Sequence, residues 1–114
     1  MRAFAVERSN AGSVRVVRVT GALDHAVVAQ FEAELKGALS DGKSSVVVSL
    51  AEATFICSAG WGTLLAASKH LLSPQRTLVL AALSPGMQAT YELLGLKSVL
   101  RVYATEADAV RFLS

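Results

Sequence analysis

The chain has 114 residues, of which 53% are hydrophobic and 18% charged, and its formal net charge is +2. This length suits one hydrophobic core, so a single domain over residues 1–114 is expected. The composition excludes a disordered chain. Lysine and arginine are scattered, without a basic run or basic residues interleaved with aromatic ones. Direct binding of nucleic acid is therefore not expected.

Three further features bear on location. No apolar stretch reaches the ~20 residues that a membrane-spanning helix needs, so membrane insertion is not expected. Charges at Arg2, Glu7 and Arg8 come too early for the apolar core of a signal peptide. The only cysteine, Cys57, excludes an internal disulfide and fits a reducing compartment. The expected location is the cytoplasm.

The first predicted elements are a β-hairpin and a helix. Residues 3–8 and 14–19 are rich in β-branched side chains, and Asn10-Ala11-Gly12 between them is a turn signal. Asp24 is a candidate N-cap for a helix that follows. Apolar residues then recur at steps of three and four, which predicts one buried helical stripe. This stripe consists of Val28, Phe31, Leu35 and Leu39.

The middle of the chain predicts a buried strand and a second helix. Gly42 suits a left-handed cap that ends the first helix. Residues 46–50 are almost continuously apolar, as in a strand buried on both faces, and Thr54-Phe55-Ile56 looks like the last part of such a strand. A helix should begin at Ser58 and run to about residue 72, where Ser73-Pro74 stops it.

The remaining sequence continues the alternation of strands and helices. Residues 77–81 predict a buried strand, and Ser84-Pro85 a cap followed by proline at the first position of a short helix that Gly95 ends. A last strand over 99–103 precedes a helix opened by residues 105–108. This order predicts βαβ crossovers, hence an α/β fold with a mixed sheet covered by about four helices. Functional groups gather beyond the carboxyl ends of strands in such sheets.

The turn Cys57-Ser58-Ala59-Gly60-Trp61-Gly62 lies at one of these places, but its residues do not predict an enzyme. A nucleophile elbow needs glycine two residues before the serine, where this chain has Ile56. His70 follows Ser58 by about 18 Å of helix axis, at roughly 1.5 Å per residue. His25 lies in the first turn of another predicted helix and is expected to be solvated. A Ser-His pair is therefore not expected.

Cofactor and metal sites are not expected either. One cysteine and two distant histidines lack the spacing of metal ligands, and Cys57 is interpreted as a small buried apolar residue. Gly60-Trp61-Gly62 has no lysine where a phosphate-binding loop would need it.

Two interpretations of Ser58 remain open. Ser58 can be an N-cap whose hydroxyl accepts a backbone N–H, with a contribution of about 1 kcal/mol. Alternatively, it is a phosphorylation site. A phosphate would add a charge of roughly −1.5 to −2 at a helix N-terminus, which tolerates it, and would disrupt an apolar partner docked there.

Several segments together resemble one family over nearly the whole chain. Residues 20–25, Thr-Gly-Ala-Leu-Asp-His, are similar to the T-G-E-L-D segment of STAS proteins of the bacterial anti-sigma-factor antagonist type. Residues 57–62 fall on the family's D-S-S/T-G-L/I-G signature. Ser84-Pro85 and Leu94-Gly95-Leu96 resemble its landmarks around the third helix.

The resemblance implies a non-catalytic partner switch. An antagonist of this type binds an anti-sigma factor that is also a serine kinase of the GHKL type, and binding frees the sigma factor. The kinase phosphorylates the signature serine and weakens binding, and a PP2C-type phosphatase restores it. The resemblance thus implies Ser58 as the phosphoacceptor. The implied partner face consists of Asp24, His25, Cys57, Ser58, Ala59, Gly60, Trp61 and Gly62.

This chain departs from the signature at three positions. Cys57 replaces the aspartate, Ala59 replaces the second hydroxyl residue, and Trp61 replaces an aliphatic residue. Ala59 leaves Ser58 as the only candidate phosphoacceptor within the turn. Trp61 is interpreted either as core filling or, if exposed, as an interface anchor. The altered turn keeps a second role open, that of a STAS subunit docked on the ATPase of an ABC-type lipid transport complex.

Overall fold

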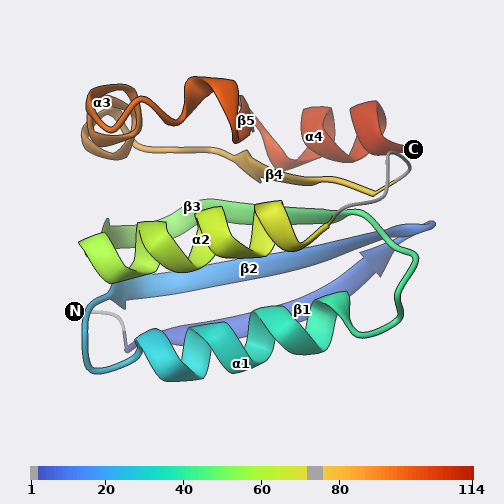
Figure 1. The fold of residues 1–114 in the computed structure, drawn as a ribbon, viewed down its shortest axis with the longest axis horizontal. Coiled ribbons are helices and arrows are strands. Elements are labelled where there is room, and N and C mark those ends of the chain that lie inside the picture. The colour runs from blue at the N-terminus through green and yellow to red at the C-terminus, as the bar shows by residue number, and fades with distance from the viewer. Residues whose placement is uncertain (1–2, 72–75) are drawn as a thin grey trace.

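A computed structural model describes residues 3–71 and 76–114, which form one α/β unit around a five-stranded sheet (Figure 1). The strands are β1 (Ala5–Ala11), β2 (Val14–Leu23), β3 (Val46–Ile56), β4 (Leu78–Ala81) and β5 (Arg101–Tyr103). The helices are α1 (Val28–Leu39), α2 (Ser58–His70), α3 (Pro85–Leu93), the 3-10 helix η1 (Leu96–Ser98) and α4 (Glu106–Leu113).

The sheet has the order β1-β2-β3-β4-β5. Strands β1 and β2 form an antiparallel hairpin, and the other neighbouring strands are parallel. The predicted mixed sheet with an N-terminal hairpin and βαβ crossovers is therefore confirmed. The four α-helices of the described residues match the predicted number.

Each face of the sheet has its own apolar cluster. The larger cluster joins one face to α1, α2 and α3, which contribute Phe31, Leu64 and Tyr91 among others. The smaller cluster joins the other face to α4, chiefly through Ala109. Arg18 on β2 also reaches α4, with two donor–acceptor distances of 2.8 Å to the carboxylate of Glu106. Helices therefore lie on both faces, and α1 and α2 lie side by side on one of them (Figure 1).

The strands differ from the predicted ones in length. Strand β2 runs ten residues, to Leu23, and so continues beyond its predicted end at residue 19, whereas β3 runs eleven residues and ends at Ile56, as predicted. Their pairing has register shifts between Arg18 and Thr20 and between Gly21 and Ala22. Gly21 has a φ of +82°, a left-handed conformation that suits glycine within an irregular strand. This irregularity, a β-bulge, lets β2 continue to Leu23, directly before Asp24.

The predicted cap of α3 is confirmed, and the predicted cap of α1 is wrong. The hydroxyls of Ser84 and Thr105 accept N–H groups at the starts of α3 and α4. Asp24, however, is not the cap of α1: the helix begins at Val28, and its N-cap, Val27, forms no side-chain hydrogen bond. The Asp24 carboxylate accepts the N–H of Ala26 at 3.0 Å instead, so it stabilises a turn that precedes the helix.

The other boundaries shift by a few residues. Helix α2 ends at His70, and the predicted stop at residues 73–74 lies outside the described residues. Strand β5 begins at Arg101 rather than at Val99, because η1 and the residues after it occupy the chain up to that point.

One loop carboxylate makes the stability of the fold dependent on pH. Asp41 follows α1 and accepts hydrogen bonds from the Ser44 hydroxyl and from the N–H groups of Ser44 and Lys43. These bonds, with a smaller contribution from the charge of Arg15, hold the pKa of Asp41 well below its ordinary value. Because the folded-state pKa is lowered, the resulting stability is present above the unfolded-state pKa and disappears as the pH falls through the folded-state pKa.

Asp41→Asn is therefore expected to lower the free energy of unfolding at pH 7, and the difference from wild type should shrink steadily below about pH 4. Urea denaturation at pH 7 and at pH 3 measures both values. Glu32→Gln is the control, because Glu32 forms only an exposed i,i+4 ion pair with Lys36. A loss in Asp41→Asn that is as large at pH 3 as at pH 7 would contradict the expectation.

Candidate functional site

The turn between β3 and α2 is fixed to the end of the neighbouring strand. The N–H of Cys57 donates to the carbonyl of Leu23 at 2.9 Å, and the carbonyl of Cys57 accepts the N–H of Trp61 at 3.1 Å. Because β2 and β3 are parallel, with Leu23 paired to Ile56, both strands end at the same edge of the sheet. This edge brings Asp24 and His25 next to the turn.

The structure divides the predicted partner face into an exposed and a buried part. The exposed residues are Asp24, His25, Ser58, Ala59 and Gly62. The buried residues are Cys57, Gly60 and Trp61. A partner could touch the first group directly, whereas the side chains of Cys57 and Trp61 and the backbone of Gly60 are buried and support the turn.

Ser58 is exposed but does not cap the helix. The N-cap of α2 is Cys57, which has an extended conformation and forms no side-chain capping bond. The capping interpretation of Ser58 is therefore wrong, because the chain enters the helix at Ser58 itself. At this first helical position the neighbouring N–H groups and the helix dipole favour a negative charge. The geometry is compatible with a phosphate on the hydroxyl.

Trp61 fills the core. Only 4% of its surface is exposed, and it belongs to the larger apolar cluster. The alternative that Trp61 is an exposed interface anchor is not supported. Cys57 is likewise buried, with 5% exposure, so its thiol lies inward beside the exposed Ser58.

Gly60 allows α2 to approach the sheet closely. A Cβ atom at this position would lie 2.9 Å from Cγ2 of Ile56 and 2.9 Å from Cδ2 of Leu23. Gly62, two residues further along the helix, has no atom within 4 Å of the place where its Cβ would be. Of these two signature glycines, only Gly60 is required by packing.

Gly60→Ala and Gly62→Ala are thus expected to change stability in opposite directions. Overpacking typically costs about 1–3 kcal/mol, which exceeds the roughly 0.5–1 kcal/mol gained when alanine replaces a helical glycine. Gly60→Ala should lower the free energy of unfolding by ~1–2 kcal/mol, and Gly62→Ala should raise it by about 0.5–1 kcal/mol. Thermal and urea unfolding measure both. Equal changes in the two variants would contradict the packing role of Gly60.

Phe55 belongs to this site although its sequence position suggested burial. The exposed fraction of Phe55 is 52%, and Thr54 is also exposed, so only Ile56 of the predicted buried strand end is inside. Phe55 pairs with Ala22 on β2, and Ala22 lies two residues before Asp24 in the sequence. Strand alternation turns Phe55 away from the face on which Ile56 lies beneath α2. A strict period of two would not have identified it, because the buried residues Leu50, Ala53 and Ile56 recur every three positions here.

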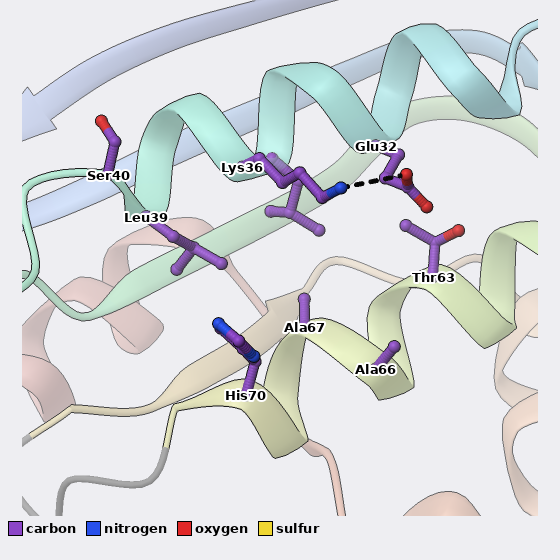
Figure 2. A pocket seen from close by; sticks show the side chains of 9 residues that line it. Glu32, Lys36, Leu39, Ser40, Thr63, Ala66, Ala67 and His70 are labelled. Carbon is purple, nitrogen blue, oxygen red and sulfur yellow. Dashed lines mark ion pairs between the residues drawn. The ribbon is translucent and has the colours of Figure 1, made fainter.

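A groove lies between α1 and α2, with a volume of about 380 Å³. Figure 2 shows Thr63, Ala67 and His70 pointing from α2 toward α1. These positions are spaced as one helical face, and the groove lies between this face and α1. At the rim, Lys36 Nζ lies 3.4 Å from the carboxylate of Glu32 (Figure 2).

Filling this groove should stabilise the protein. Ala67 is partly buried against the larger cluster, so Ala67→Leu is expected to raise the free energy of unfolding by about 0.5–2 kcal/mol. Ala66 also lines the groove but is exposed, and Ala66→Leu should have a smaller effect. Urea denaturation compares the two variants. A lower stability of Ala67→Leu would show that α1 and α2 cannot accommodate the added methyl groups.

Within residues 3–71 and 76–114, no cluster of three or more His, Cys, Asp or Glu side chains is arranged to hold a metal ion. Among the described helices, none combines the length and the apolar character needed to span a membrane.

Comparison with known proteins identifies the family of this chain. The family model of the STAS domain matches residues 5–109. The chain belongs to the STAS family. The resemblance to the STAS family predicted from residues 20–25 and 57–62 is thereby confirmed.

Relatives of this STAS chain include proteins named as anti-sigma factor antagonists. The protein named "Putative anti-sigma factor antagonist BtrV", from Bordetella bronchiseptica, is 34% identical over 93 residues, which cover 81% of this chain and 80% of that protein. The crystal structure of an anti-sigma factor antagonist from Mycobacterium paratuberculosis has a TM-score of 0.88 at 22% identity, covering 97% of this chain and 94% of that chain.

The Bacillus cell fate determinant SpoIIAA is a further structural relative. Its phosphorylated form has a TM-score of 0.71 at 27% identity and covers 98% of this STAS chain and 100% of its own. The unphosphorylated form has a TM-score of 0.73 at 25% identity, with 97% of both chains covered. SpoIIAA is therefore a STAS relative with structures in two states of phosphorylation.

Proposed function

We propose that this STAS protein is an anti-sigma factor antagonist, a non-catalytic regulator that acts by binding an anti-sigma factor. The observation that carries the proposal is the exposed hydroxyl of Ser58 at the first position of α2. Exposed Asp24 and His25 lie at the same edge of the sheet, and exposed Phe55 lies on the strand that leads into the turn. The names of BtrV and of the SpoIIAA structures support the same function.

The proposed control is phosphorylation of Ser58. The unphosphorylated protein binds the anti-sigma factor, and the phosphorylated protein is released. The first turn of α2 stabilises the phosphate in the free protein, because its N–H groups have no intrahelical partners. In the complex, a charge of roughly −1.5 to −2 would face the surface of the partner and weaken binding. The likeness to SpoIIAA in its phosphorylated and unphosphorylated forms supports this control.

The proposed partners are an anti-sigma factor that is also a serine kinase of the GHKL type and a PP2C-type phosphatase. Cys57 in place of the family aspartate removes a carboxylate next to Ser58. The thiol of Cys57 is buried, so the accessible part of the turn consists of Ser58, Ala59 and Gly62. We propose that the kinase recognises Ser58 through these residues and their neighbours Asp24 and His25 rather than through residue 57.

Affinity capture from the native cell, combined with phosphorylation in vitro, tests this function. Wild type should capture an anti-sigma factor with kinase activity, and that kinase with ATP should add one phosphate to wild type and none to Ser58→Ala, as mass spectrometry measures. Ser58→Ala should still capture the kinase, since it lacks only the acceptor. Capture of the ATPase of an ABC-type transporter in place of a kinase, with Ser58 unlabelled, would refute the proposal.

A further inference from the structure

A hollow of about 340 Å³ lies beside the starts of β4 and β5. Leu78 and Val79 of β4 line it, together with Thr77, Lys97, Ser98, Val99, Arg101 and Phe112. Strands β3, β4 and β5 are parallel, so their starts lie at one edge of the sheet and the Ser58 turn lies at the other. The hollow is thus separate from the proposed partner face.

The positive charge in this hollow is not neutralised by the protein. Each of the other described arginines pairs with a carboxylate: Arg8 with Glu34, Arg15 and Arg76 with Asp41, Arg18 with Glu106, and Arg111 with Asp108. Within the described part of the chain, Arg101 and Lys97 have no such partner, and no aspartate or glutamate lines the hollow. Two cations therefore face one concave surface.

Arg101 is held in a defined orientation. Its guanidinium carbon lies 5.0 Å from the centroid of the Phe112 ring, and that ring packs at 5.2 Å against Tyr103. This cation–π contact favours a position of the guanidinium group over the ring, where its N–H donors are available to a ligand. Phe112 is 53% exposed and Val99 is 41% exposed, so an apolar surface borders the charges.

We propose that this hollow binds the phosphate monoester of a small organic molecule. A phosphate monoester carries about −1.5 to −2 charges at neutral pH, which complements Lys97 and Arg101. The guanidinium fork can donate two parallel bonds to phosphate oxygens, and the hydroxyls of Thr77 and Ser98 add donors. Phe112 and Val99 contact the organic group of the ligand. The site is independent of Ser58 and of the proposed antagonist function.

Titration of the ¹⁵N-labelled full chain with phenyl phosphate, followed by amide chemical shifts, tests the site. Residues 97–101 and 112 should shift, and phenyl phosphate should bind about fivefold more tightly than inorganic phosphate, because the ring contributes roughly 1 kcal/mol against Phe112. Arg101→Gln should weaken phenyl phosphate binding at least about tenfold, as expected when a charge-assisted bidentate contact is lost. Lys97→Gln should weaken it less.

Arg111→Gln is the matched control, because Arg111 lies on the same helix as Phe112 but is paired with Asp108. It should leave phenyl phosphate binding unchanged. Three results would overturn the proposal: no saturable shifts at residues 97–101, an equal loss of affinity in Arg111→Gln and Arg101→Gln, or equally tight binding of benzoate, which carries a single negative charge. Unchanged amide spectra of the free variants outside the hollow would show that each variant is folded.

Discussion

The Ser58→Asp variant is expected to bind the anti-sigma factor about a hundredfold more weakly than wild type, which corresponds to ~2.7 kcal/mol. The reason is that Ser58 is exposed at the centre of the proposed partner face, so a carboxylate there would have to be desolvated against the partner. Titration calorimetry with the captured anti-sigma factor measures the two dissociation constants.

Ser58→Asn is the control, because it has nearly the same shape as Ser58→Asp but no charge. It should lose much less affinity. Ser58→Asp should unfold at the same temperature as wild type or slightly above it, since a negative charge in the first turn of a helix is worth about 0.3–1 kcal/mol. Equal affinity of Ser58→Asp and wild type, with both folded, would leave the proposed phosphorylation switch without a physical basis.

Phe55→Ala should also weaken binding of the anti-sigma factor, by about thirtyfold, or ~2 kcal/mol. Aromatic side chains are enriched at the centres of interfaces, and the half-exposed ring of Phe55 lies just before the Ser58 turn. Stability should change little, because about half of the ring already faces solvent in the free protein. Binding measured by calorimetry and unfolding measured in urea separate the two effects.

Phe112→Ala is a matched control for Phe55→Ala. The two rings are almost equally exposed, at 53% and 52%, but Phe112 lies on α4 near the starts of β4 and β5. Phe112→Ala should leave the affinity for the anti-sigma factor unchanged. If both variants bind like wild type, the partner face does not include the end of β3.

Local patterns predicted most of the elements of this fold. The stripe of Val28, Phe31, Leu35 and Leu39 predicted α1, and the continuous apolar run at residues 46–50 predicted the central strand β3. Ser84 and Thr105 were visible as the starts of helices because their hydroxyls bond to N–H groups three residues ahead. These features depend only on residues that are close in sequence, so each helix or strand could be predicted from its own segment of the chain.

Predictions of the residue that caps the start of a helix were less accurate. Asp24 and Ser58 are both typical capping residues, yet neither caps a helix here. Asp24 binds within a preceding turn, and the bond between Cys57 and Leu23 fixes where α2 begins. That bond joins β3 to β2, a contact that local sequence does not specify.

The sequence by itself determined the alternation of strands and helices, the mixed sheet and the position of the Ser58 turn at the start of a helix. These follow from periodicity and from turn-forming residues within short windows. Only the tertiary structure decided that Trp61 is buried, that Phe55 is exposed and that Lys97, Arg101 and Phe112 meet in one hollow. The physical reason is that exposure and charge pairing depend on which other elements cover a residue, and those elements come from distant parts of the chain.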